Sequence, residues 1–177
     1  VPGSVLYCGL MLAVEHSGIY LGQGKIAVIV VDNLASADSS VQHSTASEFT
    51  SRSQLGRKIY VSCDKHGAVG HPRVAMHAES RIGERRFYGL FFKNCHTFST
   101  QCVEKSNQSH DAWSLGLPST WEPTITELKR RARKKLGATR WRLWDWDGSL
   151  ADDPPPEPDW QAQQDHFSNL QLTPENM

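Results

Sequence analysis

The chain has 177 residues, of which 38% are hydrophobic and 21% are charged, enough apolar sequence for one domain of ordinary size. Its longest apolar run near the start, residues 5–14, is about half as long as a membrane span and lacks the basic residues that precede the apolar core of a signal peptide. The composition therefore argues against a membrane-spanning protein, and we expect a cytoplasmic one.

Charge is unevenly distributed along the chain. The sequence holds 19 basic and 19 acidic residues, but residues 143–177 contain eight acids and no lysine or arginine, so residues 1–142 carry a net charge of +8. The end of the chain also holds the proline-rich stretch ADDPPPEPDW and a glutamine-rich segment, neither of which has a core-forming pattern. We therefore predict one domain over residues 1–147 and a disordered acidic tail over residues 148–177.

The four cysteines, at positions 8, 63, 95 and 102, form no CxxC pair and show no histidine spacing typical of a zinc site. So few cysteines in a chain of this length favour reduced thiols in a reducing compartment over a framework of two disulfides. We expect neither a metal ion nor a cofactor.

The clearest secondary structure near the start of the chain is a β-hairpin. Residues 2–4 form a turn, and an extended segment begins at residues 5–7. The hairpin follows, with residues 16–21 and the β-branched run 26–31 joined by a Gly-Gln-Gly turn. His16 lies within its first strand, where a single histidine is usually a structural or an exposed residue.

The middle of the chain alternates between predicted loops and regular elements. Residues 33–54 are rich in Ser and Thr and have little periodicity, so we expect a long surface loop that can include a short helical turn. A mobile connection is the usual role of such a loop, and a lid over a cleft is the alternative. Residues 58–63 alternate as a strand does, and residues 73–82 have the apolar spacing of an amphipathic helix that ends at Gly83.

The stretch 86–103, RFYGLFFKNCHTFSTQCV, places a cysteine at a helix start. A short apolar run, residues 87–92, leads to Asn94, which is a favourable cap residue. Apolar residues then follow at helical spacing: Phe98, Cys102 and Val103. Cys95 is therefore predicted in the first turn of a helix, where unpaired N–H groups and the helix dipole stabilise a thiolate and lower the pKa of the thiol. This suggests a nucleophilic cysteine; the simpler alternative is a buried core cysteine.

A second helix is predicted over residues 124–136, where an apolar stripe repeats at helical spacing and Gly137 is placed to end it. A solvated face is the usual role of basic residues on such a helix, and contact with anionic lipid headgroups or another acidic partner is the sharper alternative. Without interleaved aromatic residues, the helix does not indicate nucleic-acid binding. In residues 140–147 apolar and polar residues alternate, as they do in an edge strand, and the tryptophans of this segment could also form an aromatic clamp. The basic residues of the helix are Lys129, Arg130, Arg131, Arg133, Lys134 and Lys135.

Two motifs together resemble the lecithin:retinol acyltransferase-like family. The first is EHSGIYLGQGKI around His16, where a histidine, small residues and an aromatic residue precede a Gly-x-Gly turn and a β-run. The second is YGLFFKNCHTF around Cys95, with Tyr88 seven residues before the cysteine and Phe98 three residues after it. This family is similar in turn to the NlpC-type cell-wall peptidases, which are papain-like thiol enzymes, with the order permuted so that histidine precedes cysteine. The resemblance covers roughly residues 2–103.

The resemblance implies an α+β fold in which a small antiparallel sheet packs against the cysteine helix and presents the histidine to the thiol. By position, Cys95 would be the nucleophile and His16 the base that deprotonates it and later protonates the leaving group. Backbone N–H groups at the helix start would hold the oxyanion. Tyr20, Asn94 and His96, which lie in the same two motifs, are the expected substrate-binding residues.

One position departs from the family pattern. The family usually carries a third polar residue, often histidine, twelve positions after the first, and here that position is Val28. An aliphatic side chain cannot accept the imidazole N–H, so another group would have to orient the ring. Asp32 is the candidate on the same strand, although it lies about 13 Å further along it; His43 and His96 are the others.

The sequence thus predicts a cysteine-dependent acyltransferase or hydrolase that acts on a lipid or peptide acyl substrate through an acyl-thioester enzyme. A lipid substrate would need a hydrophobic groove near Cys95, which could be lined by residues that are equally suited to the core: Phe87, Leu90, Phe91 and Phe92. The alternative function is that of a catalytically inactive binding module, which keeps the fold and engages a partner or an acidic surface through its basic helix or acidic tail. Val28 favours this alternative.

Overall fold

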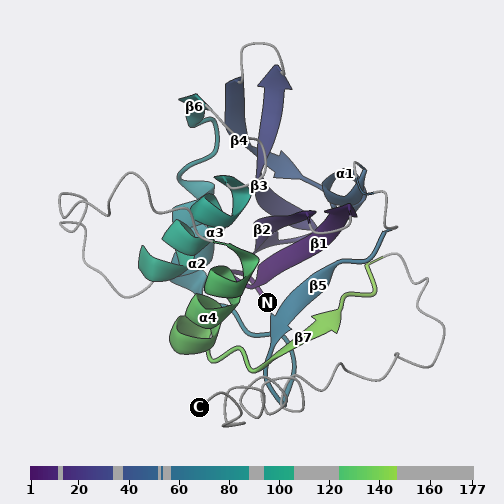
Figure 1. Ribbon diagram of the computed structural model, residues 1–177. Helices are drawn as coiled ribbons and strands as arrows, with labels where there is room; N and C mark the ends of the chain where they lie inside the picture. Colours follow the sequence, from purple (N-terminus) through teal and green to yellow (C-terminus); the bar gives the residue numbers. More distant parts are fainter. Residues whose placement is uncertain are drawn as a thin grey trace, which may run out of the picture. The chain divides into compact units, whose positions relative to one another are not determined.

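The computed structural model describes residues 1–11, 14–33, 38–51, 53, 57–87, 94–105 and 124–146, all of which belong to one compact unit, Val1–Trp146. They form an antiparallel sheet and four helices, which confirms the predicted α+β fold (Figure 1). The predicted tail, residues 148–177, lies outside the described residues, as do residues 88–93 of the apolar run before Cys95.

The sheet that the described residues form has seven strands in the order β6-β4-β3-β2-β1-β5-β7, and every neighbouring pair is antiparallel. The strand that carries His16 is β2, which therefore lies in the middle of the sheet. The strands are β1 (Val5–Met11), β2 (Val14–Gly22), β3 (Lys25–Asn33), β4 (Asp38–Ser44), β5 (Tyr60–Cys63), β6 (Arg85–Phe87) and β7 (Arg140–Leu143).

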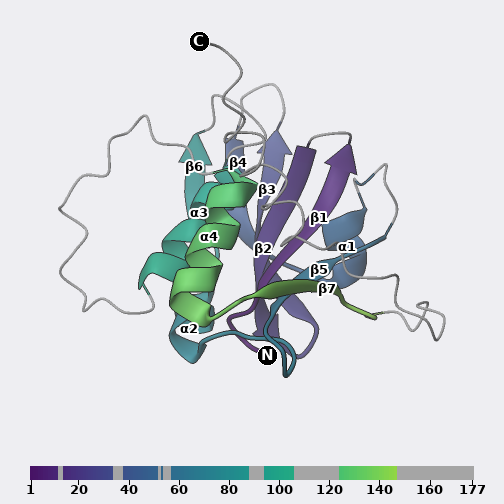
Figure 2. The ribbon, with the colours of Figure 1, turned by 60° about the horizontal axis from the view of Figure 1, so that its bottom comes forward.

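Helices cover the two faces of the sheet unequally. Of the described helices, three pack on one face, where Val5 of β1 shares a buried cluster with Phe98, and we call this the α3 face. The next residue of β1, Leu6, points the other way and shares a second cluster with Phe49, so we call that side the α1 face. Figures 1 and 2 show α2, α3 and α4 grouped together and α1 apart from them. The helices are α1 (Ala46–Thr50), α2 (Pro72–Glu79), α3 (Asn94–Glu104) and α4 (Ile125–Leu136).

The predicted β-hairpin is confirmed as β2 and β3, which pair from Ile19 and Ala27 to Gly22 and Lys25 around the turn. Gly22 and Gly24 have φ angles of 103° and 74°, in the left-handed region that glycine adopts without strain. The Gly-Gln-Gly turn therefore closes the hairpin as the sequence indicates.

On the N-terminal side of Ile19, β2 has no pairing with β3, whereas its pairing with β1 continues. In the described part of the chain, the β2–β3 partners cover residues 19–22 of β2, but the β1–β2 partners continue to Val14. The N–H of Tyr20 donates to the carbonyl of Ser4 beside β1, so alternation turns the backbone groups of residues 15 and 17 away from β1. This leaves an open edge on β2.

The prediction of a long loop over residues 33–54 is wrong for β4, whereas the short helical turn that it allowed is confirmed as α1. β4 and α1 lie within this segment, and the sheet continues through β4 to β6. The strand was missed because its buried positions include serines, such as Ser39 and Ser40, in place of the apolar residues that alternation looks for. Ser40 can be buried because its hydroxyl accepts a hydrogen bond of 2.8 Å from Gln42.

The other helices and strands agree well with prediction. α2 buries Val74, Ala75 and Ala78, as its periodicity indicates, but ends at Glu79, three residues before the predicted end. α4 begins after the cap residue Thr124 and ends at Leu136, followed by Gly137 as a C-cap in the left-handed conformation. β5 and β7 confirm the strand within 58–63 and the edge strand within 140–147. No described helix has the length and apolar character needed to cross a membrane.

Candidate active site

Cys95 is the second residue of α3, which confirms that it lies in the first turn of a helix. It is 5% exposed, and its thiol lies against the open edge of β2. The Sγ–H donates to the carbonyl oxygen of Glu15 across 3.9 Å, and the backbone N–H of Ser17 bonds to the sulfur. The thiol therefore contacts the two residues that flank His16.

His16 itself turns toward the α1 face. Its neighbour Ser17 contacts α3, so strand alternation places the imidazole on the other side of β2. There the imidazole packs on the ring of Phe49, with 5.0 Å between centroids and 31° between planes. On β1, Cys8 is the strand partner of His16, and the thiol of Cys8 donates to the carbonyl of Phe49 across 3.7 Å. The Cys95 thiol thus contacts the open edge of the β2 segment that carries His16, whereas the His16 imidazole lies on the α1 face of the sheet.

Burial dominates the electrostatics of the Cys95 thiol. Loss of solvent raises its pKa, because the charged thiolate is the form that burial disfavours. Hydrogen bonds from Ser17 and from the backbone at Cys95 and His96 lower the pKa, as expected of a helix start, but by less. The prediction that the pKa of the Cys95 thiol is lowered is therefore wrong in sign. The sequence indicates that Cys95 lies at a helix start, but it does not indicate how deeply the thiol is buried.

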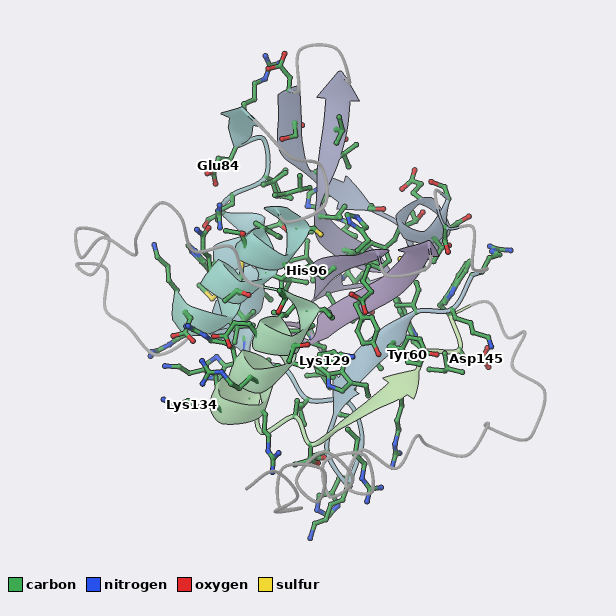
Figure 3. The ribbon with its side chains drawn as sticks, viewed as in Figure 1. Tyr60, Glu84, His96, Lys129, Lys134 and Asp145 are labelled. Atoms are coloured by element: carbon green, nitrogen blue, oxygen red, sulfur yellow. The ribbon has the colours of Figure 1, made fainter. Side chains whose placement is uncertain are left out.

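His96 lies on the α3 face and serves as an anchor for α3. Its Nδ1 is 2.9 Å from the hydroxyl of Ser17, which in turn is 3.0 Å from the hydroxyl of Ser99. Burial and the nearby Lys129 ammonium lower the pKa of His96 to about 4, so its imidazole is neutral at neutral pH. Figure 3 shows His96 and Lys129 between α3, α4 and the sheet.

A comparison with protein-family models matches residues 2–108 to the family described as lecithin retinol acyltransferase. The chain belongs to this family. Comparisons with curated proteins and with solved structures found no match. Membership in the lecithin retinol acyltransferase family indicates acyltransferase or hydrolase chemistry, and the two motif residues, His16 and Cys95, both fall within the matched region.

At the third position of the family pattern, Val28 is 2% exposed and belongs to the apolar cluster on the α1 face. Of the alternatives, His43 pairs with Glu79 at 3.0 Å on the surface and His96 lies on the α3 face, so neither joins His16. Asp32 lies in β3 where the register with β4 shifts between Val31 and Asn33, so simple alternation does not hold there. Its side chain is outside the described residues, and its role stays a prediction.

The expected substrate-binding residues of this family member are spread out. Tyr20 lies four residues further along β2 than His16, packs edge-on against Trp144 at 5.3 Å, and accepts from the N–H of Gly24. Asn94 begins α3, but its side chain is outside the described residues. Their roles in binding stay predictions, as do those of the apolar residues 87–92.

Sequence reasoning missed two residues that shape the site, Ser17 and Phe49. Ser17 stands inside the quoted motif, but its contacts with α3 depend on where the helix packs. Phe49 lies in the segment that was expected to be a loop, so nothing marked it as a neighbour of His16. In the part of the chain that the structure describes, no cluster of three or more His, Cys, Asp or Glu side chains could hold a metal ion.

Proposed function

We propose that this protein is a cysteine-dependent acyltransferase or hydrolase, with Cys95 as nucleophile and His16 as general base. The observation that carries the proposal is the contact of the Cys95 thiol with Glu15 and Ser17, the two neighbours of His16 on β2. Nucleophilic cysteine chemistry uses a thiol at a helix start with a histidine base near it, and this contact supports the proposal because it holds the thiol beside the strand that bears His16.

The proposed reaction begins when His16 takes the proton from Sγ of Cys95. The sulfur attacks the carbonyl carbon of an ester, thioester or amide, and the carbonyl electron pair moves to oxygen, where backbone N–H groups at the start of α3 stabilise it. The bond to the leaving group then breaks, His16 protonates that group, and an acyl-thioester on Cys95 remains. Water, an alcohol or an amine then attacks the thioester carbonyl and gives a proton to His16. The C–S bond breaks, the acyl product is released, and His16 returns the proton to the Cys95 sulfur.

The burial of Cys95 fits this scheme if proton transfer and attack are coupled. Because burial raises the pKa of the thiol, little thiolate exists before a base removes the proton. His16 therefore has to act as a base during attack, rather than as the partner of a preformed thiolate. Replacing His16 should consequently cost nearly as much activity as replacing Cys95.

We further propose that the acyl substrate is a lipid or a peptide, and that α4 could bring the protein to an anionic surface. Three basic residues of α4 form ion pairs within the protein: Arg131 and Lys135 pair with Glu104 on α3, and Arg130 pairs with Glu127. Two basic residues of α4, Arg133 and Lys134, are left on the exposed side of the helix. Removing both charges should weaken binding to anionic vesicles while leaving acylation in solution unchanged.

Mass spectrometry of the intact protein after brief incubation with an activated acyl ester tests the enzymatic proposal. We expect one acyl adduct on the wild type and none on Cys95→Ala or His16→Ala, with Cys63→Ala as the control for a buried cysteine in β5. Circular dichroism would establish that each variant is folded. Acylation of folded Cys95→Ala at the wild-type rate would refute the proposal.

A second candidate function is that of a catalytically inactive binding module. Two observations favour it: Val28 fills the third position with an aliphatic side chain, and burial raises the pKa of Cys95. The rate of alkylation by iodoacetamide as a function of pH separates the two functions. An active site should show alkylation that His16→Ala slows, whereas an inactive module should show a poorly reactive thiol that does not respond to His16.

A further inference from the structure

We infer that Phe49 is a positioning residue, which holds the imidazole of His16 by ring packing. The inference rests on the proposed function of His16 as general base. It concerns the α1 face of the sheet, where the third residue of the family pattern would stand and where this chain has Val28.

The contact between the two rings is direct. The Phe49 centroid is 5.0 Å from that of His16, and the planes are tilted by 31°, within the range of favourable aromatic pairs. Such a contact covers one face of the imidazole and restricts its rotation about χ2. A ring held in this way keeps a fixed position on the β2 segment whose open edge the Cys95 thiol contacts.

Gly18 provides the space in which Phe49 lies. A Cβ at Gly18, two residues from His16 on the same strand, would lie 3.2 Å from Cε2 of Phe49 and 2.8 Å from the carbonyl oxygen of Ala27. Because any side chain at this position would meet the phenyl ring and the backbone of β3, glycine lets Phe49 approach β2 beside His16.

Phe49 is itself firmly held. It is 3% exposed, and α1 begins with a capping box in which the backbone N–H of Thr45 donates to Glu48 at 2.7 Å and that of Glu48 donates to Thr45 at 3.3 Å. The carbonyl of Phe49 accepts from the thiol of Cys8, the partner of His16 on β1. Both the ring and the backbone of Phe49 are thus fixed to the strand pair that carries His16.

Three variants of the full chain test the inference. Phe49→Leu removes the aromatic face, Phe49→Tyr keeps it, and Ile59→Val trims another buried residue of the same cluster while leaving the Phe49 ring in place. Two readouts are compared: the rate of Cys95 acylation by an activated ester, and the NMR shifts of the carbon-bound protons of His16, which the Phe49 ring current displaces. The shifts require no catalysis.

We expect Phe49→Leu to slow acylation about tenfold, since small misplacements of a catalytic group cost up to roughly a hundredfold. The apparent KM should change little, and the ring-current shift of His16 should disappear. Phe49→Tyr and Ile59→Val should stay within about twofold of the wild type in rate, with the shift retained. Loss of rate together with loss of the shift, in Phe49→Leu alone, supports the inference.

Two results would overturn it: a Phe49→Leu protein with unchanged acylation, or one whose acylation falls while the His16 shifts stay at their wild-type values. A wild type that shows no Cys95-dependent acylation would refute the proposed function instead. In that case the ring-current shift alone reports the contact, and a positioning role in catalysis is excluded.

Discussion

The hydroxyl of Ser17 lies 2.9 Å from Nδ1 of His96, and this contact joins β2 to the first turn of α3. The same hydroxyl is 3.0 Å from that of Ser99, and the backbone N–H of Ser17 bonds to the Cys95 thiol. A single strand residue, buried next to His16, therefore fixes the position of the helix that carries the proposed nucleophile.

Replacing Ser17 with alanine should destabilise the protein and weaken the thiol site together. Ser17→Ala leaves a ring nitrogen of His96 and the hydroxyl of Ser99 with one buried partner fewer, so the free energy of unfolding should fall by about 1–3 kcal/mol. The pKa of Cys95 should rise further, because the Ser17 hydroxyl is one of the groups that lower it. Urea unfolding and the pH dependence of alkylation measure the two effects. Ser40→Ala, a buried serine of β4, is the control and should leave the alkylation profile unchanged.

The neutral form of His96 should make stability depend on pH. Its pKa is about 4 in the folded protein against an ordinary value of 6.5, so protonation favours unfolding. The contribution of His96 is therefore full above pH 6.5 and is lost as the pH falls from 6.5 toward 4, by up to ~3 kcal/mol. His96→Asn can still bond to Ser17 but cannot titrate. Urea unfolding across this range should show a steeper loss for the wild type than for His96→Asn, and parallel curves would contradict the assignment.

The sequence was informative where local pattern decides structure. The hairpin, α2 and α4 follow from apolar periodicity and from the turn and cap residues, and Cys95 lies in the first helical turn as its context indicates. β4 was missed because hydrogen-bonded serines take buried positions that pattern reasoning assigns to apolar residues.

What could not be predicted depends on contacts between distant segments. Phe49 contacts His16, and Ser99 contacts Ser17, and these contacts define the surroundings of the site. Because the partners are far apart along the chain, no periodic pattern in the sequence indicates these contacts. The pKa of Cys95 is a further case, since packing of α3 on β2 removes the thiol from water and this effect exceeds that of the helix start.

Glu104 should contribute to the packing of α4 on α3. Its carboxylate lies 2.6 Å from Arg131 and 3.7 Å from Lys135, both on α4. Glu104→Gln keeps the side-chain volume but removes the charge, and we expect a loss of about 1 kcal/mol that becomes smaller at high salt. Urea unfolding at low and high ionic strength measures it. Glu79→Gln, whose pair with His43 is exposed, should change stability less; an equal loss in both variants would argue against a special role for Glu104.

Restoring a polar residue at position 28 should compensate for loss of the Phe49 ring. Val28 lies in the same α1-face cluster as Phe49, at the position where the family pattern has a polar residue, so Val28→His offers His16 a hydrogen-bond partner. Burying this imidazole should cost about 1–3 kcal/mol of stability. In the wild-type background we expect little change in acylation, because Phe49 already holds the ring.

In a Phe49→Leu background, Val28→His should recover a large part of the roughly tenfold loss in acylation expected from ring misplacement. The control is Val28→Leu in the same background, which fills space but cannot form a hydrogen bond. Acylation rates of the two double variants, with thermal unfolding to confirm that each is folded, decide the matter. If leucine recovers as much activity as histidine, Phe49 acts by filling volume near β2, whereas recovery by histidine alone means that orientation of His16 is the property both residues supply.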